Sequence, residues 1–306
     1  MPRTVEISVP PNRPRELLER LERLSGVAAI LVHPEASHLP PGDLVVMRGT
    51  NQAAEAAVRV AADMRLIEAG GAMAINEPLG LASGERRQMI EGDSSDSTWE
   101  EIDTLLRRDT NPSLNFLGMM VVAGAVAGAG LMQDILHIVI GAMLIAPGFE
   151  PLVRVSAGLA CGLRDSAWRG VLSAALAYVV LALGAVGGMF AAIWLDPALA
   201  LADLPSRDWV QFWTDVKLGS VAVAFFAGLA VALVVNSHQT VFATGVMIAL
   251  ALVPGMAIFG IGFAAGLPQL ALLGLGRWAV DAACVLISSG LVFGVKRAML
   301  GRSAQQ

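Results

Sequence analysis

The sequence has little charge and few of the side chains that enzymes commonly use for chemistry. Only 15% of its 306 residues are Asp, Glu, Lys or Arg, and it contains two cysteines and four histidines. The histidines are scattered, and there is no His-Glu-x-x-His motif, no Gly-x-Ser-x-Gly motif and no Walker loop. We therefore expect a protein that is not an enzyme and that holds no metal and no cofactor.

The sequence also lacks a cysteine framework, a basic surface for nucleic acid and a signal peptide. Cys161 and Cys284 lie in apolar runs without a partner at metal-ligand spacing, so we interpret them as small buried side chains. Residues 1–110 carry a net charge of −6 and the rest of the chain carries +1, which offers nucleic acid no basic surface. The first six residues contain no apolar stretch, so we expect no cleavable signal peptide.

Apolar side chains and glycine are abundant instead. Hydrophobic residues make up 55% of the chain, and glycine occurs 32 times. This composition is typical of an integral membrane protein, and the concentration of charge near the amino terminus indicates a soluble acidic domain ahead of it. We predict a cytoplasmic domain (1–82), a linker with an amphipathic connector helix (83–111), a transmembrane domain (112–300) and a cytoplasmic tail (301–306).

The predicted cytoplasmic domain alternates strand and helix patterns in the order β-α-β-β-α-β. Residues 3–9 alternate apolar and polar side chains as a strand does, and four leucines between residues 17 and 24 recur with helical spacing. This order predicts a ferredoxin-like fold, with two helices on one face of a four-stranded sheet. A ligand-sensing role and a structural or oligomerising role both remain open.

Between the two domains we predict a solvated linker and then a helix. Residues 83–97 are rich in Gly, Ser, Asp and Glu, and Thr98 and Glu101 have the spacing of a capping box. Trp99 and Ile102 begin an apolar helix face. We interpret the helix as a connector; the alternative places it along the inner membrane surface with Trp99 as its anchor.

Six apolar segments are long enough to cross a bilayer core of about 30 Å. They are residues 114–132, 135–162, 168–195, 216–235, 240–266 and 270–295. Arginine and lysine gather before the first segment, between the second and third, and after the last, which predicts that these ends face the cytoplasm. We therefore expect a multi-pass protein of a prokaryotic inner membrane, with both termini cytoplasmic.

Two of these segments contain a Pro-Gly pair. The second segment is interrupted at Pro147-Gly148 and the fifth at Pro254-Gly255. Proline removes an amide donor and leaves carbonyl groups that, in lipid, only protein or water can satisfy. Broken middle helices in two sets of three predict a pair of inverted repeats, as in many transporters, with a site between the breaks. The alternative is two unrelated proline kinks in a glycine-rich bundle.

Two acid-arginine pairs lie in the same segments. Glu150 and Arg154, and likewise Arg277 and Asp281, are spaced by four residues and so share a helix face. Charged side chains are costly inside a membrane, so such pairs are candidates for ion or solute binding. Glu150 either pairs with Arg154 or faces a cavity and exchanges a proton.

A third polar pair, Asp134 and His137, stands at the start of the second segment. The spacing of three predicts a shared helix face, where the pair relays a proton, binds a cation or forms an interfacial hydrogen bond. An intramembrane enzyme that uses Asp134 and Asp281 as a carboxylate pair is a minor alternative.

Three stretches of the membrane domain carry a family likeness. They are Ile140-Gly-Ala-Met-Leu-Ile-Ala-Pro147, Leu250-Ala-Leu-Val-Pro254 and Ile261-Gly-Phe-Ala264. Through them, residues 112–295 resemble the DUF389 family of prokaryotic membrane proteins. The resemblance implies a multispanning inner-membrane protein, often with an N-terminal cytoplasmic extension, whose function is not assigned.

The leading prediction is translocation of a small solute or ion through the bilayer, by a secondary transporter coupled to protons through Glu150 or Asp281. An oligomeric channel is the alternative, because Gly124 and Gly128 have GxxxG spacing and could join subunits into a homo-oligomer. A membrane sensor or scaffold, with a ligand on the cytoplasmic domain, is the third possibility.

Overall fold

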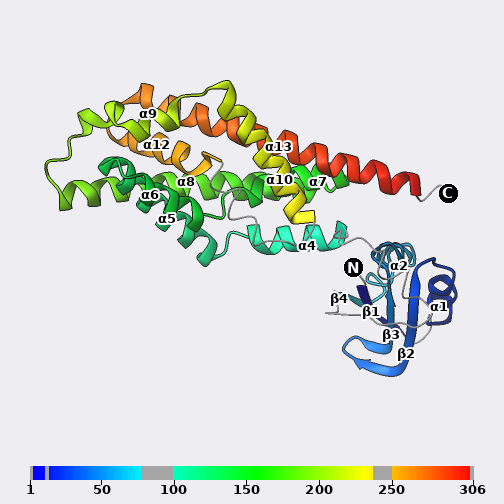
Figure 1. The fold of residues 1–306 in the computed structure, drawn as a ribbon. Helices are drawn as coiled ribbons and strands as arrows, with labels where there is room; N and C mark the ends of the chain where they lie inside the picture. Colours follow the sequence, from blue (N-terminus) through cyan, green and yellow to red (C-terminus); the bar gives the residue numbers. More distant parts are fainter. Residues whose placement is uncertain (1–2, 11–13, 77–98, 237–249, 304–306) are drawn as a thin grey trace. The chain divides into compact units, whose positions relative to one another are not determined.

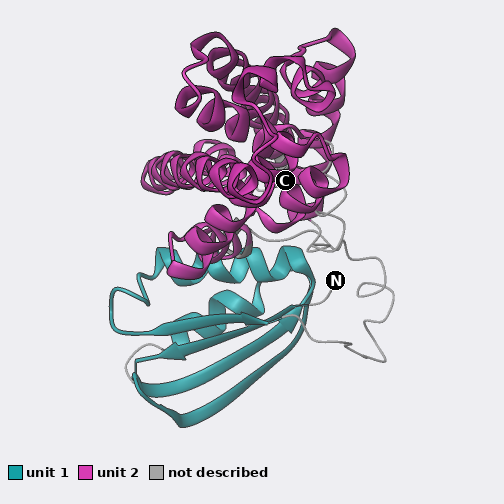
Figure 2. Ribbon diagram, turned by 90° about the vertical axis from the view of Figure 1, so that its left-hand side faces the viewer, with its two compact units in different colours: residues 1–101 teal, residues 102–306 magenta. Residues whose placement is uncertain are grey.

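The structure is a computed structural model of the chain, and it describes residues 3–10, 14–76, 99–236 and 250–303. The chain divides into two compact units, residues 1–101 and residues 102–306 (Figure 2). The first unit contains a small antiparallel sheet, and the second is made of helices. The predicted linker, residues 83–97, and Thr98 lie outside the described residues.

Unit 1 is a four-stranded antiparallel sheet with two helices. Its elements are β1 (Arg3–Val9), α1 (Pro14–Glu22), β2 (Val27–His38), β3 (Pro41–Gly49), α2 (Asn51–Asp63) and β4 (Ala72–Asn76). The strand order is β2-β3-β1-β4, so β1 is central and its Val5 pairs with Met47 on one side and Ile75 on the other. The predicted order of elements, β-α-β-β-α-β, is confirmed.

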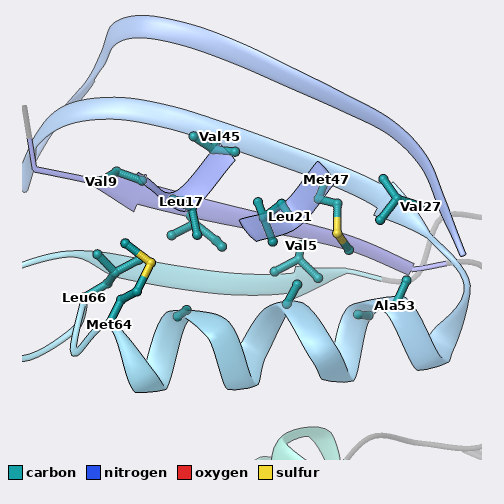
Figure 3. Packing of buried hydrophobic residues seen from close by; sticks show 14 residues of the cluster. Val5, Val9, Leu17, Leu21, Val27, Val45, Met47, Ala53, Met64 and Leu66 are labelled. Carbon is teal, nitrogen blue, oxygen red and sulfur yellow. The ribbon is translucent and has the colours of Figure 1, made fainter. Parts of the chain in front are cut away.

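The apolar residues of β1 form the centre of the core of unit 1. Val5, Ile7 and Val9 are at most 1% exposed. They belong to one cluster with leucines of α1 and alanines of α2 (Figure 3). Because side chains of a strand alternate between its two faces, these three lie on one face and can be buried together. The pattern read from the sequence thus selects the face of the sheet that the helices cover.

The described part of unit 2 is built from helices (Figure 1). They are α4 (Trp99–Thr110, whose residues from 102 belong to this unit), α5 (Leu114–Gln133), α6 (Leu136–Ile145), α7 (Glu150–Cys161), α8 (Arg164–Leu195), η1 (Leu201–Ser206), α9 (Asp208–Thr214), α10 (Leu218–Asn236), α12 (Leu252–Ala264) and α13 (Pro268–Ser303).

Among the described residues of unit 2, four helices, namely α5, α8, α10 and α13, are long and apolar enough to cross a membrane. The pair α6 and α7, bent by 44° at its break, makes a fifth span if it is counted as one. Of the predicted fifth segment, 240–266, residues 240–249 lie outside the described part, and α12 in the remainder has 13 residues. By length and composition, these helices indicate a membrane protein.

Glycines on both helices bring α5 and α8 into close contact. A Cβ atom added to Gly124 or Gly128 of α5 would come within 2.0 or 2.1 Å of a carbonyl oxygen of α8. One added to Gly184 or Gly188 of α8 would come within 2.3 or 1.9 Å of a carbonyl oxygen of α5. The prediction that Gly124 and Gly128 form a contact between subunits is therefore wrong, because this GxxxG pair packs two helices of the same chain.

Candidate functional site

The first helix break lies between α6 and α7, as predicted from Pro147. Helix α6 stops at Ile145, and the backbone of Ala146 is extended (φ −79°, ψ 119°), which is the conformation that a following proline favours. Pro147, Gly148 and Phe149 form the break, and α7 begins at Glu150 with Pro151 in its first turn. Proline is well tolerated there because the first amides of a helix have no intrahelical partner.

A tyrosine from α8 satisfies this break. The hydroxyl of Tyr178, which is 1% exposed, donates a hydrogen bond of 2.7 Å to the carbonyl oxygen of Gly148. A Cβ atom at position 148 would lie 3.2 Å from the Tyr178 hydroxyl oxygen, so glycine leaves room for this contact. A backbone carbonyl freed from its helix is thus paired inside the protein, as burial in a membrane requires.

The second break is taken as residues 250 and 251, the non-helical residues directly before α12, because residues 237–249 lie outside the described part of the chain. Helix α12 begins at Leu252, and the amide of Ala251, the residue before it, donates a hydrogen bond of 2.6 Å to Asp281 of α13. Pro254 and Gly255 are the third and fourth residues of α12. The prediction that the helix breaks at Pro254 is therefore wrong in register, because a proline in the first turn removes no helical hydrogen bond and the helix continues through it.

Asp281 forms an ion pair with Arg277, the other member of the predicted pair. Their closest atoms are 3.3 Å apart, and their side chains are 0% and 5% exposed. Arg277 also donates a hydrogen bond of 2.8 Å to the hydroxyl of Ser220 on α10. One buried network therefore joins α10, the second break and α13.

Glu150 and Arg154 do not pair as predicted. The Oε2 atom of Glu150 is buried and has no hydrogen-bond partner within the described part of the chain. Arg154 instead donates to the hydroxyls of Thr110 (2.9 Å) and Ser166 (3.3 Å). The pairing fails because α4 and α8 bring these hydroxyls to Arg154, one helical turn beyond the break where Glu150 lies.

Aromatic rings join the two breaks. The rings of Tyr178 on α8 and Trp278 on α13 meet edge to face with their centroids 5.1 Å apart. Tyr178 therefore connects the first break, through the Gly148 carbonyl, to α13, the helix that also carries Asp281.

The two breaks line one small cavity. Met143, Ala146, Gly148 and Phe149 contribute from the first, and Leu250, Leu252 and Val253 contribute from the second. The cavity has a volume of about 10 Å³, which is the space of about one water molecule. Residues of the first break and residues at the start of α12 therefore line the same cavity, which is too narrow for any larger solute.

Larger pockets reach the two arginines of this region. A pocket of about 430 Å³ extends from Lys217, between α9 and α10, to Ser220 and Arg277. Another, of about 350 Å³, is lined by Arg154 of α7 and by Arg169 near the start of α8. The two pockets share no lining residue with each other or with the small cavity.

Asp134 and His137 lie away from this site, and the prediction that they share a helix face is wrong. Asp134 ends α5 in the left-handed conformation (φ 58°), and α6 begins only at Leu136. Its carboxylate accepts hydrogen bonds from the amides of Asp208 (3.2 Å) and Trp209 (3.0 Å) at the start of α9. Its role here is to cap α9, and His137 is exposed on α6.

A repeated motif that the sequence reading missed underlies this arrangement. Residues 158–170 and 262–274 share the pattern Gly-x-Ala-x-Gly-Leu-x-x-x-Ala-x-x-Gly. In both copies the second glycine ends a helix with positive φ, 78° at Gly162 and 71° at Gly266. In both copies the first glycine packs on the alanine, with contact distances from an added Cβ atom of 2.7 and 2.8 Å.

Other members of the site were also missed. Tyr178 is the single tyrosine of the sequence, and this rarity could have singled it out. Nothing in the sequence distinguishes Trp278 and Ser220, because tryptophan and serine are common packing residues in apolar helices. Among the described residues, no group of three His, Cys, Asp or Glu side chains is arranged to hold a metal ion.

Comparison with known proteins agrees with the sequence resemblance. The model of the family DUF389, described as a domain of unknown function, matches residues 143–287. An uncharacterized protein of Methanocaldococcus jannaschii is 28% identical over 196 residues, which cover 63% of this chain and 58% of the relative. The chain thus matches somewhat more than half the length of that relative. No solved structure matches the chain.

Proposed function

Because residues 143–287 belong to the DUF389 family, a domain of unknown function, we propose a function from the geometry of the site. The protein moves a small solute or ion across a prokaryotic inner membrane, as a secondary transporter driven by protons. The observation that carries this proposal is the cavity lined by both helix breaks. Irregular backbone at membrane depth is tolerated where it lines a cavity, and transporters bind their substrates at such breaks.

The proposed architecture is six spans in two inverted repeats of three helices. The motif at 158–170 and 262–274 supports a repeat, since it gives the same helix end and the same glycine-alanine contact twice. The packing also supports it: α7 contacts α8 and α13, whereas α12 contacts α13 and α8. Three spans in each repeat place the second repeat in the membrane in the opposite sense.

We also propose that unit 1 is a ferredoxin-like domain on the cytoplasmic side. Its strand order, β2-β3-β1-β4, and its element order support that fold. The positive charges at the end of α4, between α7 and α8 and in α13 support cytoplasmic termini by the positive-inside rule.

A transporter fits the site better than a channel does. The cavity of about 10 Å³ holds no solute, so transport requires the breaks to separate. Wider pockets reach inward to Arg154 and to Arg277 without joining that cavity. This arrangement supports a barrier at the breaks that opens during transport, as an alternating-access transporter requires.

Glu150 is the proposed proton carrier. One of its carboxyl oxygens is buried without a hydrogen-bond partner within the described residues, at the first residue after the break. Such an oxygen is free to accept a proton when the site changes state. Asp281, by contrast, is held by Arg277 and by the amide of Ala251.

The test is solute and ion flux into liposomes that contain the purified full-length protein, measured with and without an imposed pH gradient. We expect uptake that saturates with solute concentration and that the gradient accelerates. Flux that follows the solute gradient without saturation indicates the channel alternative. Absence of flux across a broad panel of solutes, with correct insertion verified, contradicts translocation and favours a sensor whose ligand binds residues 1–82.

A further inference from the structure

We propose that unit 2 binds a phosphate group, of a lipid headgroup or of free inorganic phosphate, in the pocket between α4, α7 and α8. The pocket has a volume of about 350 Å³, which is within the usual range for small-molecule sites. It is lined by Arg107, Asn111, Pro112, Arg154, Arg169, Leu172, Ser173 and Leu176. None of these residues lines the cavity between the breaks, so this proposal does not depend on the transport proposal.

The first argument is the state of Arg154. Its side chain is buried, with 5% of the residue exposed, and its hydrogen bonds go to the neutral hydroxyls of Thr110 and Ser166. Within the described part of the chain it has no carboxylate at ion-pair distance. Ser166 in turn donates to Asp103 at 2.8 Å, so this carboxylate reaches Arg154 only through a hydroxyl. A buried charge without a direct ion pair is costly. An anion in the pocket that Arg154 lines would supply the missing charge.

The second argument is the set of charges around Arg154. Arg107 and Arg169 line the same pocket as Arg154, and Asp103 and Asp165 lie beside them at ion-pair distance. Each of these acids is already engaged: Asp103 binds Nε of Arg107 at 2.6 Å, and Asp165 binds Nε of Arg169 at 3.0 Å. These two ion pairs leave the charge of Arg154 without an ion pair of its own, and Arg154 lines the pocket.

The third argument is the chemistry of the donors. A guanidinium has five N–H groups, and each of the two ion pairs is made through Nε, so the terminal N–H groups of Arg107 and Arg169 remain to meet a further oxyanion. A guanidinium group can donate two parallel N–H bonds to two oxygens of the same phosphate, so arginine suits a tetrahedral oxyanion. Asn111 and Ser173 add an amide and a hydroxyl to the wall.

The fourth argument distinguishes the source of the phosphate. Leu172 and Leu176 line the pocket and are 51% and 42% exposed on α8, a helix apolar enough to span a membrane. The pocket therefore has an apolar rim where acyl chains can lie while the arginines hold the headgroup. Free phosphate would use the arginines and gain nothing from this rim.

The experiment is calorimetric titration of the full-length protein in a phosphate-free maltoside detergent, with two probes: inorganic phosphate and short-chain phosphatidylglycerol. We expect binding of at least one probe by the unsubstituted protein. Arg154→Gln and Arg169→Gln are each expected to weaken it by about tenfold or more, because each removes a charge-assisted contact. Binding of the lipid alone identifies a headgroup site, and binding of both probes with similar affinity identifies a phosphate site.

Arg164→Gln is the matched control, because Arg164 is an exposed arginine at the start of the same helix and does not line the pocket. The affinity of Arg164→Gln for each probe is expected to stay within about twofold of that of the unsubstituted protein. If Arg154→Gln does not fold, Arg169→Gln decides, since the Arg169 side chain is 63% exposed. Failure of both probes to bind the unsubstituted protein, or an equal loss with Arg164→Gln, overturns the proposal.

Discussion

The hydroxyl of Tyr178 and the carbonyl of Gly148 are 2.7 Å apart, and this single bond links α8 to the point where the second membrane segment is interrupted. Gly148 lies between α6 and α7, so its buried carbonyl has no partner within a helix and needs a donor from elsewhere. Here a phenol supplies it, and the contact has an equivalent at the second break, where Asp281 accepts from the amide of Ala251.

Tyr178→Phe removes this bond and leaves the Gly148 carbonyl unpaired. We expect the free energy of unfolding to fall by about 1–3 kcal/mol, measured as thermal stability of the purified protein in detergent. Phe190→Leu, at a side chain of the same helix that is 56% exposed, is expected to change it by less than about 0.5 kcal/mol. Equal stability of Tyr178→Phe and the unsubstituted protein would contradict a role for the bond.

Asp281→Ala leaves Arg277 as a buried charge without its partner. We expect the free energy of unfolding to fall by about 3–5 kcal/mol, measured by thermal unfolding of the purified protein in detergent. Replacing both residues at once, as Arg277→Met with Asp281→Leu, is expected to recover part of that loss because no unpaired charge remains. A double replacement that is less stable than Asp281→Ala would show that the ion pair is not the reason for the loss.

Gly188→Ala places a Cβ atom where the carbonyl oxygen of Ala125 is 1.9 Å away, so α5 and α8 must move apart. A loss of about 1–3 kcal/mol is expected, read from the midpoint of thermal unfolding followed by size-exclusion chromatography. Its neighbour provides the control: Gly187 has nothing within 4 Å of an added Cβ, and Gly187→Ala is expected to be neutral or slightly stabilising. Similar losses for both would argue against the close contact.

Asp134→Asn keeps a side chain that tolerates the left-handed conformation but turns one acceptor of the α9 amides into a donor. We expect α9 to lose about 1 kcal/mol of local stability, seen as faster hydrogen exchange of its amides. Asp203→Asn, at an exposed residue of η1, should leave that exchange unchanged. Unchanged exchange in Asp134→Asn would mean that the cap does not stabilise α9.

Glu150→Gln keeps the size of the side chain and removes its ability to release a proton. If Glu150 carries protons, uptake driven by a pH gradient is abolished, as measured in the liposome assay. Glu68→Gln, at a side chain of unit 1 that is 73% exposed, is the control and should transport normally. Undiminished uptake by Glu150→Gln would remove this residue from the mechanism.

The sequence predicted those features that depend on local chemistry. The break at Pro147 follows from a missing amide donor, and the order of elements in unit 1 follows from the alternation of apolar residues. The ion pair of Arg277 and Asp281 follows from a spacing of four on one helix. In each case a few neighbouring residues determine the outcome.

Features that depend on partners from distant segments were not predictable in this way. The spacing of Glu150 and Arg154 fixes a shared face, but the hydroxyls that Arg154 binds come from α4 and α8. The role of Asp134 depends on α9, about seventy residues later in the chain. Gly124 and Gly128 allow close packing, and only the tertiary fold decides that the partner is α8.

Tyr178 is the only tyrosine in the chain. A spectroscopic label on tyrosine therefore observes the first break directly. Biosynthetic incorporation of 3-fluorotyrosine introduces one fluorine nucleus into the whole protein, beside the Gly148 carbonyl and the Trp278 ring. If the breaks separate as proposed, two fluorine resonances in exchange would report the populations of the narrow and separated states, and a shift of these populations on adding a solute would indicate that the solute binds. The reporter needs no cysteine substitution and no attached dye.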